Sequence, residues 1–438
     1  MKAPLDNFLS RPRRVGSAVA RLFGYYEKVI LALLAVVIVV SGTYWYRQFT
    51  VGRDGSPNAG GSYVEGIVGD EQELRQIALR LTKVGFFRFD TDGRLANVLV
   101  KDWQVNPDKT IYNFTLKEKI DRNEIITDLE NNIDLFGSAS VEQNEAGQIV
   151  MTTVEPNPSL PLVLTQPLFD YGPYKVSKAT DQTTIFSRNP KEGAQLPYLN
   201  KIIVHSYATK EELQQALSKK KLDGAEAVDV SIPAGYSLKS YSMERYLAVI
   251  FNLNKSPFRE PALRQAIVDG QTIPTTPFTL TVADQEPNKT LATEIVKQWE
   301  ARGAKVTLEV KPMDEIQDKV GPSRTFQALM IGIDYGTELD PTYLWSSTQI
   351  RPPGNNLSGI KSASVDSQIE AIRATLNANE RMTLIDQLHS QIQKEYAAVF
   401  VRQEKINFVA RDRLEISTPW LARTIADRYR SIADWYVK

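Results

Sequence analysis

The stretch FTLTVADQEPNKTLATEIVKQWEARGAKVTLEV, residues Phe278–Val310, decides the fold class. Residues Phe278 to Val282 form an apolar run that predicts a strand. Apolar residues then recur at helical spacing, which predicts a helix from Asn288 to Arg302 that ends at Gly303. Residues Lys305 to Val310 alternate in polarity and predict a second strand. A strand–helix–strand unit of this length is a parallel crossover, so we expect an α/β lobe.

A second buried strand is predicted at FQALMIGI (326–333), followed by the turn-rich segment DYGTELDPTYLW (334–345). Ligands of α/β lobes usually lie at the carboxyl ends of the strands. Three carboxylates, those of Asp334, Glu338 and Asp340, therefore raise three alternatives: a catalytic pair, a metal loop, or a site for a ligand's positive charge. The spacing does not match a calcium loop. Acid–base chemistry needs partner groups that the segment lacks, so we expect neither a catalytic nor a metal site.

Composition narrows the functional classes further. The 438 residues include 52 basic and 52 acidic side chains, so the formal net charge is zero, and the apolar fraction is 42%. Proteins that bind nucleic acid usually carry a strongly basic domain, so no nucleic-acid partner is expected. There is no Cys, which excludes disulfides and thiolate metal sites. There are only two His, too few for a His-rich metal site. We expect no cofactor, and a chain of two or three domains.

The N-terminal region predicts a membrane anchor. Residues Val29 to Tyr46 carry no charge, and at ~1.5 Å per residue they cover most of a ~30 Å hydrocarbon core. Basic residues are in excess before this run and aromatic residues end it, which places the N-terminus in the cytoplasm. We expect a cytoplasmic segment at 1–28, a transmembrane helix at Val29–Phe49 in the lipid bilayer, and a flexible linker at 50–61. A cleavable signal peptide is the alternative, although no small-x-small cleavage site is evident.

From residue 60 onward, a collinear series of motifs resembles bacterial extracellular solute-binding proteins of family 5, the oligopeptide and dipeptide-binding components of ABC importers. The motifs include YGPYKVSK (171–178), SRNPKEGAQLPYLNKIIVH (187–205), YLAVIFNLNKSPFREPALRQAIVDG (246–270) and GNNLSGIKSASVDSQIEAI (354–372). The family's long insert after its FTLK-type strand is short in this chain. We therefore expect a reduced accessory hairpin region at about residues 95–150.

The resemblance implies the two-lobed α/β fold of type II periplasmic binding proteins, here preceded by one transmembrane helix. Lobe 1 is expected at 62–248 plus 414–438, and lobe 2 at 249–413. By position, Asp334 takes the family role of contacting the ligand's α-amino group. The other expected ligand-binding residues are Tyr335, Tyr343, Trp345, Gly172, Tyr174 and Asn252.

The function that the resemblance implies is solute binding without enzymatic activity. We expect the main domain outside the cytoplasm, where it captures a peptide or another small amine-bearing solute in an interlobe cleft. It then delivers the solute to the transmembrane permease subunits of an ABC importer. The alternative is a binding-protein fold that has lost transport and acts as a cell-surface scaffold or sensor. An extracytoplasmic hydrolase is the least favoured class.

Overall fold

This computed structural model describes residues 59–438, except 70, 91, 138, 227–230 and 418–421. The predicted cytoplasmic segment, the transmembrane helix at Val29–Phe49 and most of the linker lie outside the described residues. Within the described part of the chain, no helix is both long and apolar enough to cross a membrane. Residues Gly61–Val437 form one compact unit.

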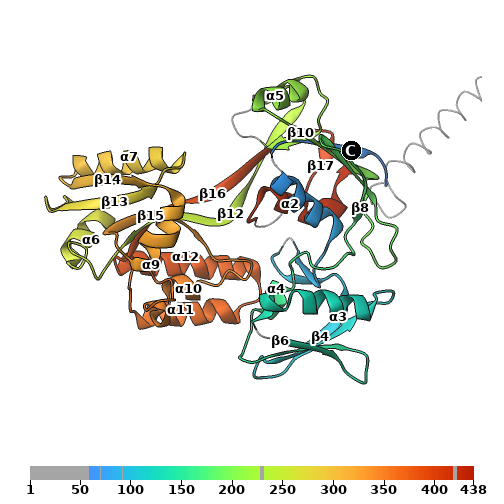
Figure 1. Ribbon diagram of the computed structural model, residues 1–438, viewed down its shortest axis with the longest axis horizontal. Helices are drawn as coiled ribbons and strands as arrows, with labels where there is room; N and C mark the ends of the chain where they lie inside the picture. Colours follow the sequence, from blue (N-terminus) through green and yellow to red (C-terminus); the bar gives the residue numbers. More distant parts are fainter. Residues whose placement is uncertain (1–58, 70, 91, 138, 227–230, 418–421) are drawn as a thin grey trace, which may run out of the picture. The chain divides into compact units, whose positions relative to one another are not determined.

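Two long strands run through a ten-stranded sheet. Strands β12 (Tyr236–Phe251) and β16 (Ala398–Arg411) are antiparallel partners, and their register shifts between Ser242 and Tyr246 (Figure 1). The strand order is β14-β13-β15-β12-β16-β11-β1-β10-β9-β8. The lobe boundary expected after residue 248 therefore falls inside β12.

The predicted crossover unit is confirmed at one end of this sheet. Strands β13 (Pro277–Ala283) and β14 (Lys305–Lys311) pair in parallel, and helix α7 (Asn288–Ala301) connects them. Gly303, just after α7, has a φ of +103°, a conformation that suits glycine and ends the helix. The predicted second strand is β15 (Ala328–Asp334), which pairs with β13 in parallel and with β12 in antiparallel.

Both faces of this end of the sheet are covered by helices. Helix α7 lies on one side of the sheet, and α11 (Ala363–Ala374) and α12 (Ala378–Lys394) lie on the other (Figure 1). Alternate β12 residues point to opposite faces, so Val249 belongs to the core of α7 and Ile250 to the core of α11 and α12. The two-residue period of the strand therefore supplies two separate cores. The two helices are separated near residue 377, and Asn377 is the N-cap of α12.

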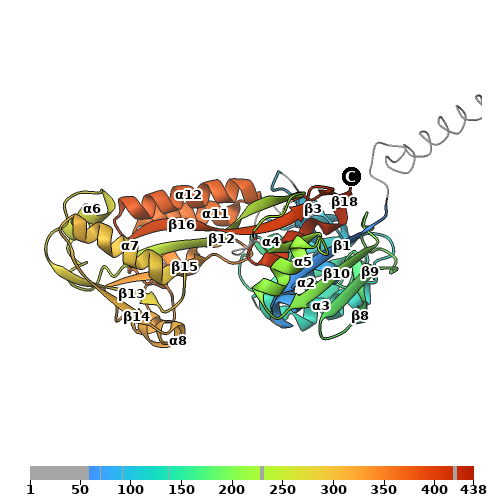
Figure 2. The same ribbon diagram turned by 90° about the horizontal axis from the view of Figure 1, so that it is seen from above.

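The other end of the sheet is built in the same way. Its strands are β1 (Ser62–Val68), β8 (Tyr174–Ala179), β9 (Thr183–Arg188), β10 (Lys201–Tyr207) and β11 (Gly224–Glu226). Helix α2 (Glu71–Thr82) and the 3₁₀ segment η4 (Ile425–Asp434) share one core on one face. Helix α5 (Lys210–Ser218) packs against β1 and β10 in a smaller core (Figure 2).

A separate core lies under the accessory region. Four antiparallel strands in the order β4-β5-β7-β6 pack with α3 (Arg122–Asn131), η1 (Ile133–Phe136) and α4 (Leu160–Val163). The strands are β4 (Val100–Val105), β5 (Ile111–Leu116), β6 (Ala139–Gln143) and β7 (Ile149–Thr153). The predicted hairpin is the β4–β5 pair, whose turn is held by Asn106 through bonds from the N–H groups of Thr110 and Ile111.

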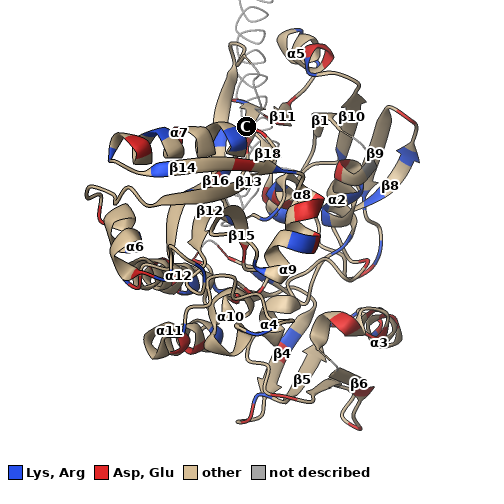
Figure 3. Cartoon of the chain, turned by 60° about the vertical axis from the view of Figure 1, so that its left-hand side comes forward, with Lys and Arg blue, Asp and Glu red and all other residues tan. Residues whose placement is uncertain are grey.

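The remaining elements are short connections. They are β2 (Phe87–Phe89), β3 (Leu95–Asn97), α6 (Pro261–Val268), α8 (Met313–Glu315), η2 (Ile316–Val320), α9 (Gly321–Ser323), α10 (Thr342–Trp345), η3 (Ser347–Gln349), β17 (Leu414–Glu415) and β18 (Tyr436–Val437). Acidic and basic residues are interspersed along the described elements, as expected from a net charge of zero (Figure 3).

Candidate functional site

A pocket of about 680 Å³ is the candidate site. It is lined by the end of α2, by the segment from Phe87 to Asp90, by Ser240–Ser242 of β12 and by the second half of η4. The volume lies within the range of roughly 300–1,000 Å³ that is usual for small-molecule pockets. Its lining combines apolar and aromatic groups with several charged side chains, which is the composition expected of a site that binds a small solute.

A buried carboxylate organises the charged wall of the pocket. Asp427 Oδ1 lies 2.5 Å from Arg80 Nη2 and 3.0 Å from Arg430 Nε. Its Oδ2 accepts from the backbone N–H groups of Arg423 at 2.7 Å and Thr424 at 2.9 Å. Burial alone would raise the pKa of Asp427, but the charges of Arg430 and Arg80 and these N–H donors lower it to about 2. Asp427 is therefore ionised and fully engaged.

The two arginines on this wall repel each other. Burial, followed by the positive charge of Arg430, lowers the pKa of Arg80 to about 10, against the opposing effect of Asp427. Both guanidinium groups remain charged at neutral pH, yet they share one carboxylate. At the rim, by contrast, Lys83 pairs with Asp170 at 3.1 Å and Arg88 pairs with Asp434 at 3.2 Å. The rim charges are thus matched one to one, whereas the wall holds one excess positive charge.

A second buried carboxyl group lies near the wall, on β12. Glu244 is 4% exposed, and its Oε2 has no hydrogen-bond partner among the described residues. The nearest cation is Arg423, whose Nε is 3.9 Å from that oxygen. Burial raises the pKa of Glu244 to about 8, and the opposing effect of Arg430 and Arg423 does not offset it. Glu244 is therefore mostly protonated at neutral pH.

Asp334, the predicted ligand anchor, is already paired within the chain. Its Oδ1 accepts from the N–H of Gly336 at 2.9 Å, and its Oδ2 lies 3.4 Å from Arg423 Nη2 and 3.9 Å from Arg245 Nη2. Arg423 also donates to Thr337 Oγ1 at 2.9 Å. Asp334 does not line the pocket. Its role toward a ligand's amino group stays a prediction.

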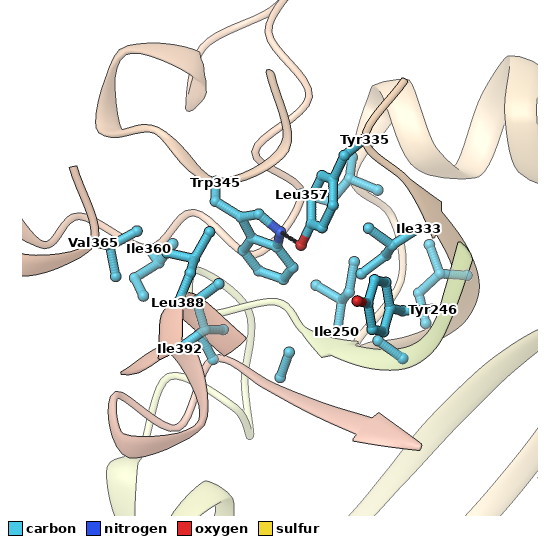
Figure 4. Packing of buried hydrophobic residues seen from close by; sticks show 14 of the residues in the cluster. Tyr246, Ile250, Ile333, Tyr335, Trp345, Leu357, Ile360, Val365, Leu388 and Ile392 are labelled. Carbon is cyan, nitrogen blue, oxygen red and sulfur yellow. Dashed lines mark hydrogen bonds between the residues drawn. The ribbon is translucent and has the colours of Figure 1, made fainter. Parts of the chain in front are cut away.

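Tyr335 and Trp345 lie in the core beneath β12 and β15. Trp345 Nε1 donates to the Tyr335 hydroxyl at 2.9 Å (Figure 4). The same hydroxyl is 2.7 Å from His389 Nε2. Both side chains are almost completely buried. Tyr343 is 53% exposed, and its hydroxyl donates to the carbonyl of Pro353 at 3.4 Å. The structure thus does not bring these three residues together at the pocket, and contact with a ligand stays a prediction for each.

Gly172 and Tyr174 flank Pro173, which does line the pocket. The Gly172 N–H donates to the carbonyl of Thr82 at 3.0 Å, and a Cβ at Gly172 would lie 2.3 Å from the carbonyl carbon of Thr82. Only glycine allows this approach to the end of α2, which carries Arg80. Tyr174 is buried and donates to the carbonyl of Leu199 at 3.2 Å. A direct contact of either residue with a ligand stays a prediction.

Asn252 lies apart from the pocket. Its side-chain amide donates to the carbonyls of Arg324 at 3.0 Å and Phe326 at 3.1 Å, and its Oδ1 accepts from the N–H of Asn254. These bonds fix the loop before β15. A ligand role for Asn252 also stays a prediction.

Sequence reasoning missed the charged wall of the pocket. The one local signal is the i,i+3 spacing of Asp427 and Arg430, which is typical of a side-chain ion pair on a helix. Arg80 is distant in sequence from both, so nothing in the pattern links it to them. Within the described residues, no cluster of three or more His, Asp or Glu side chains is arranged to hold a metal ion.

Comparisons with known proteins show which protein family and which solved structures this chain is similar to. Residues 137–270 match the family model described as "Bacterial extracellular solute-binding proteins, family 5 Middle". A search of curated proteins finds no sequence match. Among the solved structures that share the fold at low identity are an ABC transporter substrate binding protein, an oligopeptide-binding protein and a protein in complex with nickel.

The first of these structures is the ABC transporter substrate binding protein CtaP from Listeria monocytogenes, with a TM-score of 0.66, 14% identity, and coverage of 87% of this chain and 100% of CtaP. The oligopeptide-binding protein AppA from Bacillus subtilis, in complex with a nonapeptide, has a TM-score of 0.58 and 12% identity over 87% of this chain and 100% of AppA. NikZ from Campylobacter jejuni, in complex with Ni(L-His), has a TM-score of 0.58 and 15% identity over 86% of this chain and 99% of NikZ.

These structures share the fold of the described residues, and the predicted two-lobed α/β binding-protein fold is confirmed there. The family model matches residues 137–270, which are less than half of the chain, so it shows that this segment is similar to the family 5 solute-binding proteins.

Proposed function

We propose that this protein is the extracytoplasmic solute-binding component of an ABC importer and that it captures its solute in the pocket beside α2 and η4. The observation that carries the proposal is the pocket itself: about 680 Å³, with apolar, aromatic and polar groups in its walls and two partly buried arginines that share one buried carboxylate. The family match and the fold support solute binding rather than catalysis.

The proposed ligand is a short peptide or a similar small solute. AppA is described with a nonapeptide and NikZ with Ni(L-His), so this fold accommodates ligands of different size and chemistry. The pocket volume favours a short ligand over a long one. Binding transmits a signal to a permease only if the solute stabilises one arrangement of the lobes over another. The long strands β12 and β16 run through both ends of the sheet and would carry that change.

Membrane attachment is part of the same proposal. The uncharged run Val29–Phe49 would hold the binding domain next to its permease, on the outer side of the membrane, and the linker at 50–61 would let it move. Tethering raises the effective concentration of a binding protein near its partner.

Calorimetry on the purified full-length protein with mixed short peptides tests solute capture. Binding heat and a rise in melting temperature are expected. Ser240, an exposed residue of β12 that lines the pocket, offers a blocking variant: Ser240→Trp should abolish the heat. Leu238→Trp is the matched control, because Leu238 is 51% exposed on the same strand and outside the pocket lining. Absence of heat and of any co-purifying solute by mass spectrometry would favour the scaffold alternative.

A further inference from the structure

We infer that the pocket holds its solute by a carboxylate group seated against Arg80 and Arg430, and that the solute's amino group is not the anchor. The inference rests on the proposed function and assigns the chemical class of the solute. The role expected for Asp334 would require a positively charged group on the solute, whereas this inference requires a negatively charged one. It follows from a comparison of the charges on the pocket wall that have partners with those that do not.

The wall has spare capacity for an anion. Asp427 Oδ1 accepts from both arginines, and its Oδ2 accepts from two backbone N–H groups, so this carboxylate cannot neutralise a further charge. Arg430 uses only Nε in this contact, and its Nη1 and Nη2 have no hydrogen-bond partner among the described residues. A guanidinium with two free N–H groups matches a carboxylate in bidentate geometry.

The pocket offers no comparable place for an ammonium group. Two acidic residues line the described pocket, Asp90 and Asp434. Asp90 Oδ1 accepts from the N–H groups of Asp92 and Arg94 at 2.9 Å each, so it stabilises its own turn. Asp434 pairs with Arg88 at the rim. Asp434 is thus neutralised by Arg88, whereas Asp90 keeps its charge and is one acid against the two arginines of the wall.

The groups behind the wall do not cancel its charge. Glu244, the nearest further carboxyl group, is buried and mostly protonated at neutral pH. Asp334 is engaged by Arg423 and does not line the pocket. The excess positive charge of Arg80 and Arg430 therefore faces a partly apolar pocket that is also lined by neutral polar side chains such as that of Gln195, and an anion is attracted there more strongly than in open water.

Capped peptides test the inference on the unmodified full-length protein. A random tripeptide mixture is compared by calorimetry with the same mixture N-acetylated and the same mixture C-amidated. Acetylation removes the ammonium group and should change the Kd by less than roughly threefold, whereas amidation removes the carboxylate and should weaken binding by roughly tenfold or more. Equal binding of the amidated mixture, or loss on acetylation, would overturn the inference but leave solute capture standing. No binding of any of the three mixtures would overturn both.

Variants of Arg430 locate the anchor. Arg430→Gln should weaken binding of the uncapped mixture by roughly 10- to 100-fold and abolish the difference between uncapped and amidated peptides. Arg430→Lys keeps the charge but not the fork and should restore part of that difference. Arg94→Gln, which alters an exposed pair with Asp92 outside the pocket lining, is the matched control and should leave the difference intact. If Arg430→Gln kept the full preference for a free carboxylate, Arg430 would not be the anchor.

Discussion

The loop Asp334–Trp345 and the wall around Asp427 both combine carboxylates with arginines, but they differ in how many charges have partners. In the loop, Asp334 lies beside Arg423 and Arg245, and Asp340 Oδ2 is 3.4 Å from Arg373 Nε. Arg245 also has a second acid, Glu404, at 3.8 Å, so three arginines meet three acids. At the wall, two arginines share one acid. Where acids and bases balance, the charges serve the structure; where they do not, the excess is available to a ligand.

The two regions also differ in burial. Asp427 is completely buried, whereas the side chain of Asp334 is 30% exposed. Charges at the wall are therefore poorly screened by water, and those in the loop are partly screened. Substitutions at the two places should accordingly have effects of different size.

The largest effect is expected at Asp427. Asp427→Asn removes the buried charge that Arg80 and Arg430 share, so it should lower the free energy of unfolding by about 3–5 kcal/mol, the usual cost of breaking a buried ion pair. Urea denaturation of the full-length protein measures this. Asp434→Asn is the control, because its pair with Arg88 is exposed and should contribute only about 0–1 kcal/mol. Equal losses for both variants would contradict the distinction between wall and rim.

The contribution of Asp427 to the stability of the fold should decrease as the pH falls. The pKa of Asp427 is about 2 in the folded protein and 3.8 ordinarily, so the folded state binds the proton less readily than the unfolded state. Its contribution to stability is therefore present above pH 3.8 and is lost as the pH falls toward 2. Melting curves recorded across this range should show a smaller loss for Asp427→Asn than for the unmodified protein.

A smaller effect of opposite sign is expected at Glu244. Its pKa is about 8 in the folded protein and 4.5 ordinarily, so between these values the folded state holds a proton that the unfolded state releases. Stability should fall as the pH rises from 4.5 to 8. Glu244→Gln removes this dependence and should stabilise the protein at pH 8 relative to pH 5 by about 1–3 kcal/mol, the usual cost of an unsatisfied buried polar group. A pH-independent difference in melting temperature would contradict the assignment.

The sequence predicts what depends on near neighbours. The crossover from Pro277 to Lys311, the β4–β5 hairpin and the break between α11 and α12 follow from periodicity and turn residues within short windows. Asp340 likewise acts on a near neighbour, since its Oδ1 accepts from the N–H of Thr342 at 2.8 Å. Each of these features is confirmed because its physical cause lies within a few residues.

The candidate site depends on distant neighbours, which the sequence does not identify. Arg80 on α2 meets Asp427 on η4 only because both elements pack on one face of the sheet. Aromatic residues after a strand are compatible with a core or with a pocket, and periodicity does not separate the two for Tyr335 and Trp345. The sequence also does not identify the ion-pair partner of Asp334, because Arg423 is far away in the chain.

The smallest effect on stability is expected at Asp334. Asp334→Asn keeps the acceptor for the Gly336 N–H and removes only long, partly exposed contacts with Arg423 and Arg245, so unfolding should change by less than about 1 kcal/mol. If a carboxylate anchors the solute at the wall, this variant should also bind the uncapped and N-acetylated tripeptide mixtures nearly as the unmodified protein does. A loss of roughly tenfold or more that is confined to peptides with a free amino group would instead make the loop the anchor, because a buried charge pair with a ligand ammonium is worth that much. The comparison of loop and wall would then reverse, with Arg423 acting as the internal cation that the ligand displaces.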